Sequence, residues 1–296
     1  MDNLLKSVIL TPFNILYRIN PVAELKLLFR LKCGYRLDLK SPKTYNEKIQ
    51  WIKLYDKNPL MTKCCDKYTV REYVEGKGCK EILNELLWEG FNPEDIPFDE
   101  LPQKFVIKVT HGSCFNIICT NKNELDRADV IKKCRKWLKA KFLEAYGEWF
   151  YGVEKPRVIV EKYLDDGTKR LRDYKVYCFN GQPRYIGVDS GDETSGTHYK
   201  DIYDLNWNLI KGYRMAYPNS GVPVDKPAAL AQLIKYAKIL SADFLHARTD
   251  FYIINDQIVF GEITFSNSAG FGRVEPEEFA LKMGAYLELQ SEKNDS

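Results

Sequence analysis

Polar residues near the C-terminal end of the chain interrupt two apolar runs. Segment 248–271 reads RTDFYIINDQIVFGEITFSNSAGF, and its two β-rich runs, 250–254 and 257–264, flank an Asn-Asp pair. An Asn-Asp pair between two such runs is typical of a tight hairpin turn. In that hairpin, Asp250 and Glu262 would be cross-strand neighbours. Two carboxylates within apolar strands need a compensating positive charge, because a lone buried carboxylate is costly.

Two explanations fit this pair of acids. The first is a magnesium ion, which takes one or two carboxylates together with phosphate oxygens and water. The second is a buried ion pair, for example between Arg248 and Glu262. The metal explains both acids, and we therefore favour it, while the ion pair stays open.

The segment KVTHGSCFN combines a strand lysine with a loop of small residues. Lys108 leads into Gly112, Ser113 and Asn116. Small residues let backbone N–H groups approach phosphate oxygens, and the lysine supplies a positive charge. No GKS or GKT follows, so this is not a P-loop, and an ordinary hairpin loop is the alternative.

Two further strands carry charges where they end or begin. Glu161 and Lys162 follow the apolar run VIV, where a planar base could meet backbone hydrogen-bonding groups. Asp173 and Lys175 share one strand face by the period of two, with Arg172 just outside. A solvated strand end and plain surface charge are the respective alternatives. No nucleophile pattern of the Ser/His/Asp or Cys/His kind is evident.

The elements that must position these residues alternate between helical and strand-like patterns. Segment 41–75 predicts two helices split at Asn58 and Pro59, and a Pro-rich stretch follows. Segment 122–148 predicts a long helical region, and 227–240 a further helix. Asn180 and Gly181 predict a hairpin turn. The order of helices and sheets indicates an α+β protein.

Composition excludes several classes of protein. The 296 residues are 45% hydrophobic, and 44 Lys and Arg against 41 Asp and Glu give a net charge of +3. This supports a globular protein and gives no reason to expect nucleic acid as a partner. Eight cysteines occur without a CxxC pair. Together with the lack of an evident signal peptide, they favour reduced thiols in the cytoplasm.

The first 35 residues are apolar and basic. Their longest uncharged run, 7–17, has 11 residues and contains Pro12, whereas a membrane-spanning helix needs about 20 apolar residues. The pattern suits an arm lying on an anionic membrane surface, which Pro12 and Pro21 would break into short helical pieces. A helical arm packed on its own domain or on a second subunit is the alternative.

Taken in order, four segments resemble the TupA-like branch of the ATP-grasp superfamily. They are LPQKFVIKVTHGSCFN, VIVEKYL, DYKVYCFNGQP and RTDFYIINDQIVFGEITF, and the resemblance extends over about residues 43–289. It implies an ATP-grasp fold, in which two α+β lobes clamp a nucleotide, with a helical N-terminal region. The implied domains are a basic amphipathic arm, a helical region, a small lobe with the phosphate loop and a large lobe with the metal site, at 1–40, 41–100, 101–165 and 166–296.

The resemblance also implies roles for individual residues. Lys108 matches the lysine on the α-phosphate. Two further sets match the loop that closes on the phosphates and the hinge that receives adenine, namely Gly112, Ser113 and Asn116, and Glu161, Lys162 and Leu164. Lys175 matches a cation near the terminal phosphate, and Arg248 an arginine that steadies the activated carboxylate. Asp250 and Glu262 match the magnesium ligands. We assign substrate binding to Arg172, His198, Arg248 and Asn267.

Two departures from the family pattern stand out. The superfamily often has Glu-x-Asn at the metal, whereas this chain has Glu262-Ile263-Thr264 with an asparagine only at 267. The phosphate loop has Cys114 where glycine would be more flexible. The number of magnesium ions therefore stays open.

The resemblance implies an ATP-dependent, ADP-forming carboxylate–amine ligase with ATP and Mg²⁺ as cofactors. A sugar-acid or amino-acid carboxylate would be activated as an acylphosphate and attacked by an amine, in the assembly of a capsule, O-antigen or teichuronopeptide. The expected partner is a small-molecule or polysaccharide-linked substrate, met at the cytoplasmic face of the inner membrane. A glycosyltransferase using a nucleotide sugar is the alternative, although no clear Asp-x-Asp ends a strand. A catalytically idle scaffold is disfavoured because the phosphate and metal positions are filled.

Overall fold

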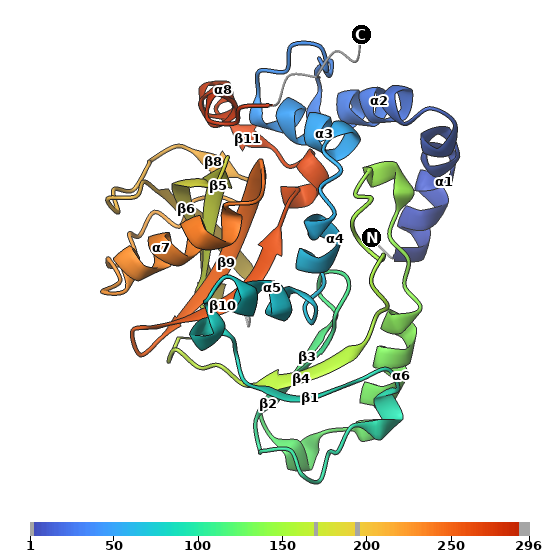
Figure 1. The fold of residues 1–296 in the computed structure, drawn as a ribbon, viewed down its shortest axis with the longest axis vertical. Coiled ribbons are helices and arrows are strands. Elements are labelled where there is room, and N and C mark those ends of the chain that lie inside the picture. Colours follow the sequence, from blue (N-terminus) through green and yellow to red (C-terminus); the bar gives the residue numbers. More distant parts are fainter. Residues whose placement is uncertain (1–2, 169–170, 193–195, 290–296) are drawn as a thin grey trace.

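The computed structural model describes residues 3–168, 171–192 and 196–289. Helices and antiparallel sheets alternate along the chain, which confirms the α+β class (Figure 1). The helices are α1 (Asn3–Ile19), α2 (Pro21–Cys33), α3 (Tyr45–Tyr55), α4 (Leu60–Cys64), α5 (Val70–Gly76), α6 (Arg127–Leu138), α7 (Leu230–Ser241) and α8 (Glu277–Ala285). The strands are β1 (Leu86–Gly90), β2 (Phe105–Val109), β3 (Asn116–Cys119), β4 (Val158–Lys162), β5 (Asp173–Phe179), β6 (Gln182–Asp192), β7 (Thr197–Tyr203), β8 (Arg214–Met215), β9 (His246–Ile254), β10 (Gln257–Thr264) and β11 (Val274–Glu275).

The smaller of the two main sheets lies at the bottom of Figure 1 and has the strand order β1-β4-β2-β3, antiparallel throughout. Along β2, Phe105, Ile107 and Val109 alternate into a core that includes side chains of α6. Val106 and Lys108 are therefore left on the opposite face. That face turns toward the larger sheet, since Tyr252 of β9 lines a cavity together with Val106 and Lys108.

The larger sheet has the order β10-β9-β5-β6-β7, and helix α7 covers one of its faces (Figure 1). Val176 and Phe251 point to that side and pack in one core with Leu233 of α7. On the other face, Tyr177 and Phe179 pack beneath α3 and α8. Because strand side chains alternate, β5 and β9 also place their charged residues on this second face, beyond the part that α3 and α8 cover.

The predicted hairpin of β9 and β10 is confirmed. Its turn residues Asn255 and Asp256 have φ of 49° and 62°, as a type I′ turn requires. Asp250 lies opposite Glu262 in the register, just beyond an irregularity at Gly261. A Cβ on Gly261 would lie 3.0 Å from the carbonyl oxygen of Asp250, so glycine permits the close approach of the two strands there.

Two helix predictions were wrong in extent. Segment 41–75 holds three helices, because Asp66 Oδ1 accepts the N–H groups of Tyr68 and Thr69 at 2.9 and 3.0 Å and separates α4 from α5. The long helix expected over 122–148 is reduced to α6. Beyond it the chain turns at Gly147, with φ of 66°, which a helix does not tolerate.

Strand β1 lies inside region 41–100, which the sequence predicts to be helical. It pairs with β4, with Glu89 opposite Ile159. The smaller sheet therefore takes one strand from before residue 101. The prediction failed here because LLWEG is too short to show a period of its own.

The N-terminal arm packs on its own domain, which was the alternative to a membrane-lying arm. Asn14 Oδ1 accepts the N–H of Ala145 at 2.9 Å, and Arg18 binds Glu144 through two bonds of 2.5 and 2.7 Å. Contrary to expectation, α1 continues through Pro12, whereas Pro21 does start a new helix, α2. Within the described residues, no helix has the length and apolar character needed to span a membrane.

Candidate active site

A cavity of about 240 Å³ lies between the smaller sheet and β9 of the larger one. Four predicted nucleotide-binding residues lie on its wall, namely Lys108, Asn116, Lys162 and Leu164. Its apolar wall, from Val106, Ile118, Leu171 and Tyr252, suits a planar ring. The cavity has a flat apolar part and a cationic part, as a nucleotide requires.

Glu161 does not line this cavity. Its carboxylate accepts a bond of 2.6 Å from Lys108 Nζ and lies 3.5 Å from Arg71 Nη1. The Glu161 side chain is nearly buried, at 9% exposed, whereas that of Lys108 is 24% exposed. Glu161 therefore positions the lysine, and any contact that residue 161 makes with a base would come from its backbone.

The loop that joins β2 and β3 is shaped by two left-handed residues. Gly112 has φ of 85° and Cys114 of 63°. A Cβ at Gly112 would lie 2.8 Å from the Phe115 ring, so glycine is required there. Ser113 and Cys114 are exposed at the tip. The loop is tied to the larger sheet through Lys67, which donates to Gly112 O at 2.9 Å and lies 3.7 Å from Glu262.

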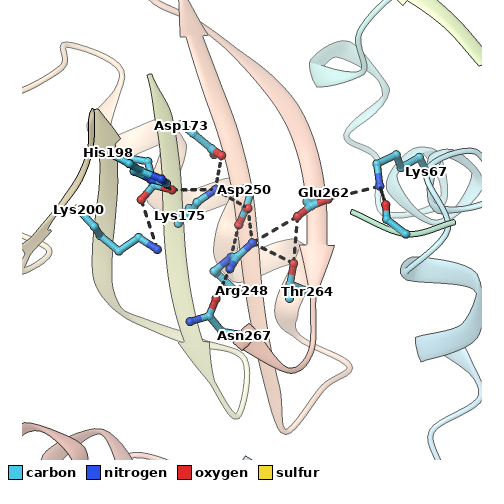
Figure 2. A network of polar contacts seen from close by, with 12 residues as sticks. Lys67, Asp173, Lys175, His198, Lys200, Arg248, Asp250, Glu262, Thr264 and Asn267 are labelled. Carbon is cyan, nitrogen blue, oxygen red and sulfur yellow. Dashed lines mark hydrogen bonds and ion pairs between the residues drawn. The ribbon is translucent and has the colours of Figure 1, made fainter. Parts of the chain in front are cut away.

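The charged face of the larger sheet is organised around Arg248 (Figure 2). Its Nε and Nη2 donate to the two carboxylate oxygens of Asp250 at 2.7 and 2.6 Å. Nη2 also reaches Thr264 Oγ1 at 3.1 Å and Glu262 Oε1 at 3.3 Å, while Nη1 donates to Asn267 at 2.6 Å. The ion pair between Arg248 and Glu262 that the sequence left open is therefore present, and Asp250 belongs to it as well.

Lys175 is the second cation of this face. Its Nζ binds Asp173, lies 3.0 Å from Asp250 Oδ2 and 3.6 Å from Asp189 Oδ2. Burial lowers the pKa of Lys175, but the carboxylates of Asp250 and Asp173 outweigh it and hold that pKa well above its usual range. Burial raises the pKa of Asp173 to about 6, against the opposing charge of Lys175.

Asp250 lies between the two cations. Burial alone would raise the pKa of its carboxyl group, but Arg248 and then Lys175 outweigh burial and hold the pKa below its usual range. Asp250 is therefore ionised at neutral pH. Removing its charge would leave two buried cations undercompensated.

Asp250 and Glu262 are the residues of this face that would hold a magnesium ion. Within residues 3–168, 171–192 and 196–289, no group of three or more His, Cys, Asp or Glu side chains is placed to hold a metal. Glu262 keeps 41% of its side chain exposed, whereas both oxygens of Asp250 are engaged by cations. Two carboxylates on paired strands fit a hard cation that also takes phosphate oxygens. They do not form a protein cage for a metal alone.

The predicted substrate-binding residues lie in different places. Asn267 contacts Arg248 directly. His198 Nε2 lies 3.3 Å from Asp189 Oδ2, and its ring stacks on Tyr217 at a centroid distance of 3.7 Å. Both belong to the network of Figure 2. Arg172 lies elsewhere: its backbone N–H donates to Asp166 Oδ2 at 3.0 Å, and Asp166 lines the cavity that contains Lys108.

The loop that carries Asn267 is held by the polar face of α3. Ser268 and Ala269 adopt left-handed φ of 50° and 55°. Lys53 Nζ donates to Ala269 O at 2.7 Å and to the carbonyl of Tyr146 at 2.6 Å, and Gln50 donates to the same Ala269 oxygen at 3.2 Å. These donors fix a loop conformation that its own sequence does not favour.

Some residues of the site escaped prediction. Tyr252 follows Asp250 by two positions, so the strand period alone would have placed it on the same face. Asp189 binds Lys200 and His198 and gave only the weak signal of an acid in a β-rich run. Lys67 lies between two short helices, and no local pattern links it to Gly112 or Glu262.

Comparisons with known proteins give one family match. The family model described as TupA-like ATPgrasp matches residues 47–288. A comparison with curated protein sequences gave no match.

Solved structures resemble the chain only distantly. A D-alanine–D-alanine ligase from Bacillus anthracis has 16% identity and a TM-score of 0.42, over 75% of this chain and 59% of that one. The enzyme of the same type from Helicobacter pylori has 12% identity and a TM-score of 0.46, over 84% and 68%. An L-amino acid ligase from Bacillus licheniformis has 13% identity and a TM-score of 0.47, over 76% and 49%. The chain thus spans about half to two thirds of these ligases.

The two acids of the hairpin should differ in what they contribute to stability. We expect Asp250→Asn to lower the free energy of unfolding by about 3 kcal/mol, because it leaves two buried cations undercompensated. Glu262→Gln should cost less than about 1 kcal/mol, because the side chain is 41% exposed. Urea denaturation at neutral pH measures both values. Equal losses for the two variants would contradict the buried network.

Proposed function

Because the chain belongs to the TupA-like ATP-grasp family, we propose that it is an ATP-dependent carboxylate–amine ligase that releases ADP. The observation that carries the proposal is the position of Tyr252. It lines the cavity that contains Lys108 and lies two residues from Asp250 on the same strand face. A nucleotide whose base lies in the cavity would direct its phosphates toward Arg248 and Glu262.

The proposed reaction has two steps. A carboxylate oxygen of the acid attacks the γ-phosphorus of ATP, the bond from this phosphorus to the bridging oxygen breaks, and ADP leaves with the electron pair. The amine nitrogen then attacks the carbonyl carbon of the acylphosphate. The bond to the phosphate oxygen breaks, inorganic phosphate leaves, and the nitrogen gives up a proton. An amide is formed without a side-chain nucleophile.

The residues of the site have distinct tasks in this proposal. Lys108 binds phosphate oxygens at the mouth of the cavity, and Glu161 holds it in place. Arg248 orients the carboxylate and offsets its charge as the acylphosphate forms. Asp250 and Glu262 would hold Mg²⁺, which offsets the negative charge of the phosphates when it is bound.

We further propose that the acid or the amine belongs to a bacterial surface polysaccharide such as capsule, O-antigen or teichuronopeptide. The resemblance to the TupA-like branch supports this part. A mass spectrum of the product formed from hexuronic acids, amino acids and ATP would test it. A product without a sugar would count against it.

The ligase proposal is tested by nucleotide release. With ATP, Mg²⁺ and a panel of hexuronic acids and amino acids, ADP and phosphate should form only when an acid is present. Glu262→Gln should lower this rate by about 100-fold, since removing one charge-stabilising group costs that much in other enzymes. Glu278→Gln, on the exposed surface of α8, should keep the parent rate. AMP release would indicate adenylation, and turnover of a nucleotide sugar would favour the glycosyltransferase.

Lys108→Ala should weaken ATP binding by about tenfold or more, because a charge-assisted bond to phosphate is lost. The fold should persist, since Arg71 still lies 3.5 Å from Glu161. Isothermal titration calorimetry measures the affinity. Lys132→Ala, an exposed lysine of α6, is the matched control. Unchanged affinity in the Lys108 variant would refute the assignment of this cavity.

We also propose that the arm attaches reversibly to an anionic membrane at the cytoplasmic face. Four apolar residues of α1 and α2 are exposed, namely Ile15 at 54%, Ile19 at 76%, Leu27 at 45% and Leu31 at 65%. Lys26 and Arg30 are exposed among them, and over residues 10–37 the single acid, Glu24, is buried. An apolar stripe with basic neighbours and no exposed acid complements an anionic lipid surface.

Vesicle binding tests this attachment. The full chain should co-sediment with phosphatidylglycerol vesicles at low salt and not with phosphatidylcholine vesicles, because each basic residue near an anionic surface adds about 1 kcal/mol. Changing Leu27 and Leu31 together to Gln should abolish binding. Leu281→Gln, an exposed leucine of α8, should not. Binding that ignores lipid charge would refute the proposal.

A further inference from the structure

A second cavity, of about 630 Å³, lies between the N-terminal arm and segment 140–156. Helix α1 contributes Tyr17 and Arg18 to its wall, and the loop after β2 contributes His111. In the part of the chain that the structure describes, no residue lines both this cavity and the one at Lys108. It is therefore a separate compartment, large enough for a second small molecule.

This cavity ends beside the phosphate loop and the charged face. His111, on its wall, directly precedes Gly112 of the phosphate loop. Glu148, also on the wall, accepts a hydrogen bond from Ser266 Oγ, and Ser266 precedes the Asn267 that binds Arg248. A molecule in this cavity would thus face the place where an acylphosphate forms.

Tyr151 links the two regions electrostatically. It lines the cavity, and burial raises the pKa of its phenol well above the usual range. The charges of Glu148 and, to a lesser extent, Glu262 add to this rise, whereas Arg248 opposes it. Charged groups of the cavity wall and of the Arg248 network thus both act on the Tyr151 phenol.

Two polar groups of the wall lack a hydrogen-bond partner in the described part of the chain. His111 is 3% exposed, and its Nε2 faces the carbonyl of Ala140 at 2.9 Å, which assigns the proton to Nε2 and leaves Nδ1 as an acceptor. Neither His111 Nδ1 nor Trp149 Nε1 has a hydrogen-bond partner among the described residues, although both atoms are buried. Such groups are costly unless a ligand or water satisfies them.

The remaining wall supplies charge and an apolar surface. The carboxylate of Glu148 lies at the inner end, and Lys141 is exposed at the rim. The rings of Phe142 and Tyr151 stack at a centroid distance of 4.6 Å and 8° between planes. The acceptors of Glu148 and His111, the cation of Lys141 and a flat apolar wall suit a small zwitterion with an organic side chain. The inner carboxylate disfavours a phosphate or another anion.

We propose that this cavity binds the amine substrate and that this substrate is an amino acid, with its ammonium group at Glu148 and His111 and its carboxylate toward Lys141. This inference rests on the ligase function proposed above. It assigns to the N-terminal arm one wall of a substrate site. The bonded pair of Arg18 and Glu144 would hold that wall in place.

Fluorescence titration tests the site without turnover. The common L-amino acids are added one at a time to the full chain with ADP and Mg²⁺, and the emission of Trp149 reports binding. At least one amino acid should change the emission, and Trp149→Phe should remove that change. Glu148→Gln and Lys141→Ala should each weaken binding by about tenfold, as expected for loss of one charged hydrogen bond. Lys139→Ala is the matched control, since Lys139 is exposed and does not line the cavity.

The outcomes separate this inference from the ligase proposal. If no amino acid changes the emission, or if Lys139→Ala weakens binding as much as Lys141→Ala, the site assignment is wrong. Amino-acid binding without ADP formation would refute the ligase and leave the site. ADP formation without amino-acid binding in this cavity would refute the site and leave the ligase proposal. Circular dichroism checks folding, and the exposed Lys141 keeps the test decisive if Glu148→Gln does not fold.

Discussion

Burial of the Arg248 guanidinium is the constraint on which the rest of the site depends. Arg248 is 7% exposed and cannot shed its proton, so its N–H groups need acceptors within hydrogen-bond reach. Nε and Nη2 bind Asp250, Glu262 and Thr264, and Nη1 binds Asn267. These hydrogen bonds fix the register of β9 against β10, the irregularity at Gly261 and the position of the loop after β10. The carboxylate pair is thus set first by an ion network, and any metal must bind within that arrangement.

The alternation of strand side chains explains why this network lies where it does. On β5, Val176 and Cys178 enter the core beneath α7, while Lys175 and Tyr177 point to the opposite face. Helices α3 and α8 cover the aromatic end of that face and leave its charged end open toward the smaller sheet. In the proposed ligase, the two cavities border the charged face around Arg248 from two sides. One would supply the phosphates and the other the attacking amine.

The features that could be predicted from the sequence are those with short sequence separation. The hairpin and the pairing of Asp250 with Glu262 follow from a separation of twelve positions and a turn signal, and the shared face of Asp173 and Lys175 follows from a spacing of two. Contacts across long separations left no local trace, such as that of Lys53 with Ala269, 216 positions apart. The same limit applies to β1, whose partner strand lies far along the chain. Pro12 was misjudged for another reason, since α1 accommodates it within a helix braced at Glu144 and Ala145.

The hydrogen bonds from α3 to the loop after β10 limit how far the chain can be truncated. Both main sheets begin beyond residue 85, so a fragment starting after Tyr55 would retain every strand. It would lack Gln50 and Lys53, and Ala269 would keep its left-handed conformation without the donors that stabilise it. Asn267 would then lose its fixed position opposite Arg248. The shortest piece of this chain able to assemble the site is therefore longer than the sheets that carry its charged residues.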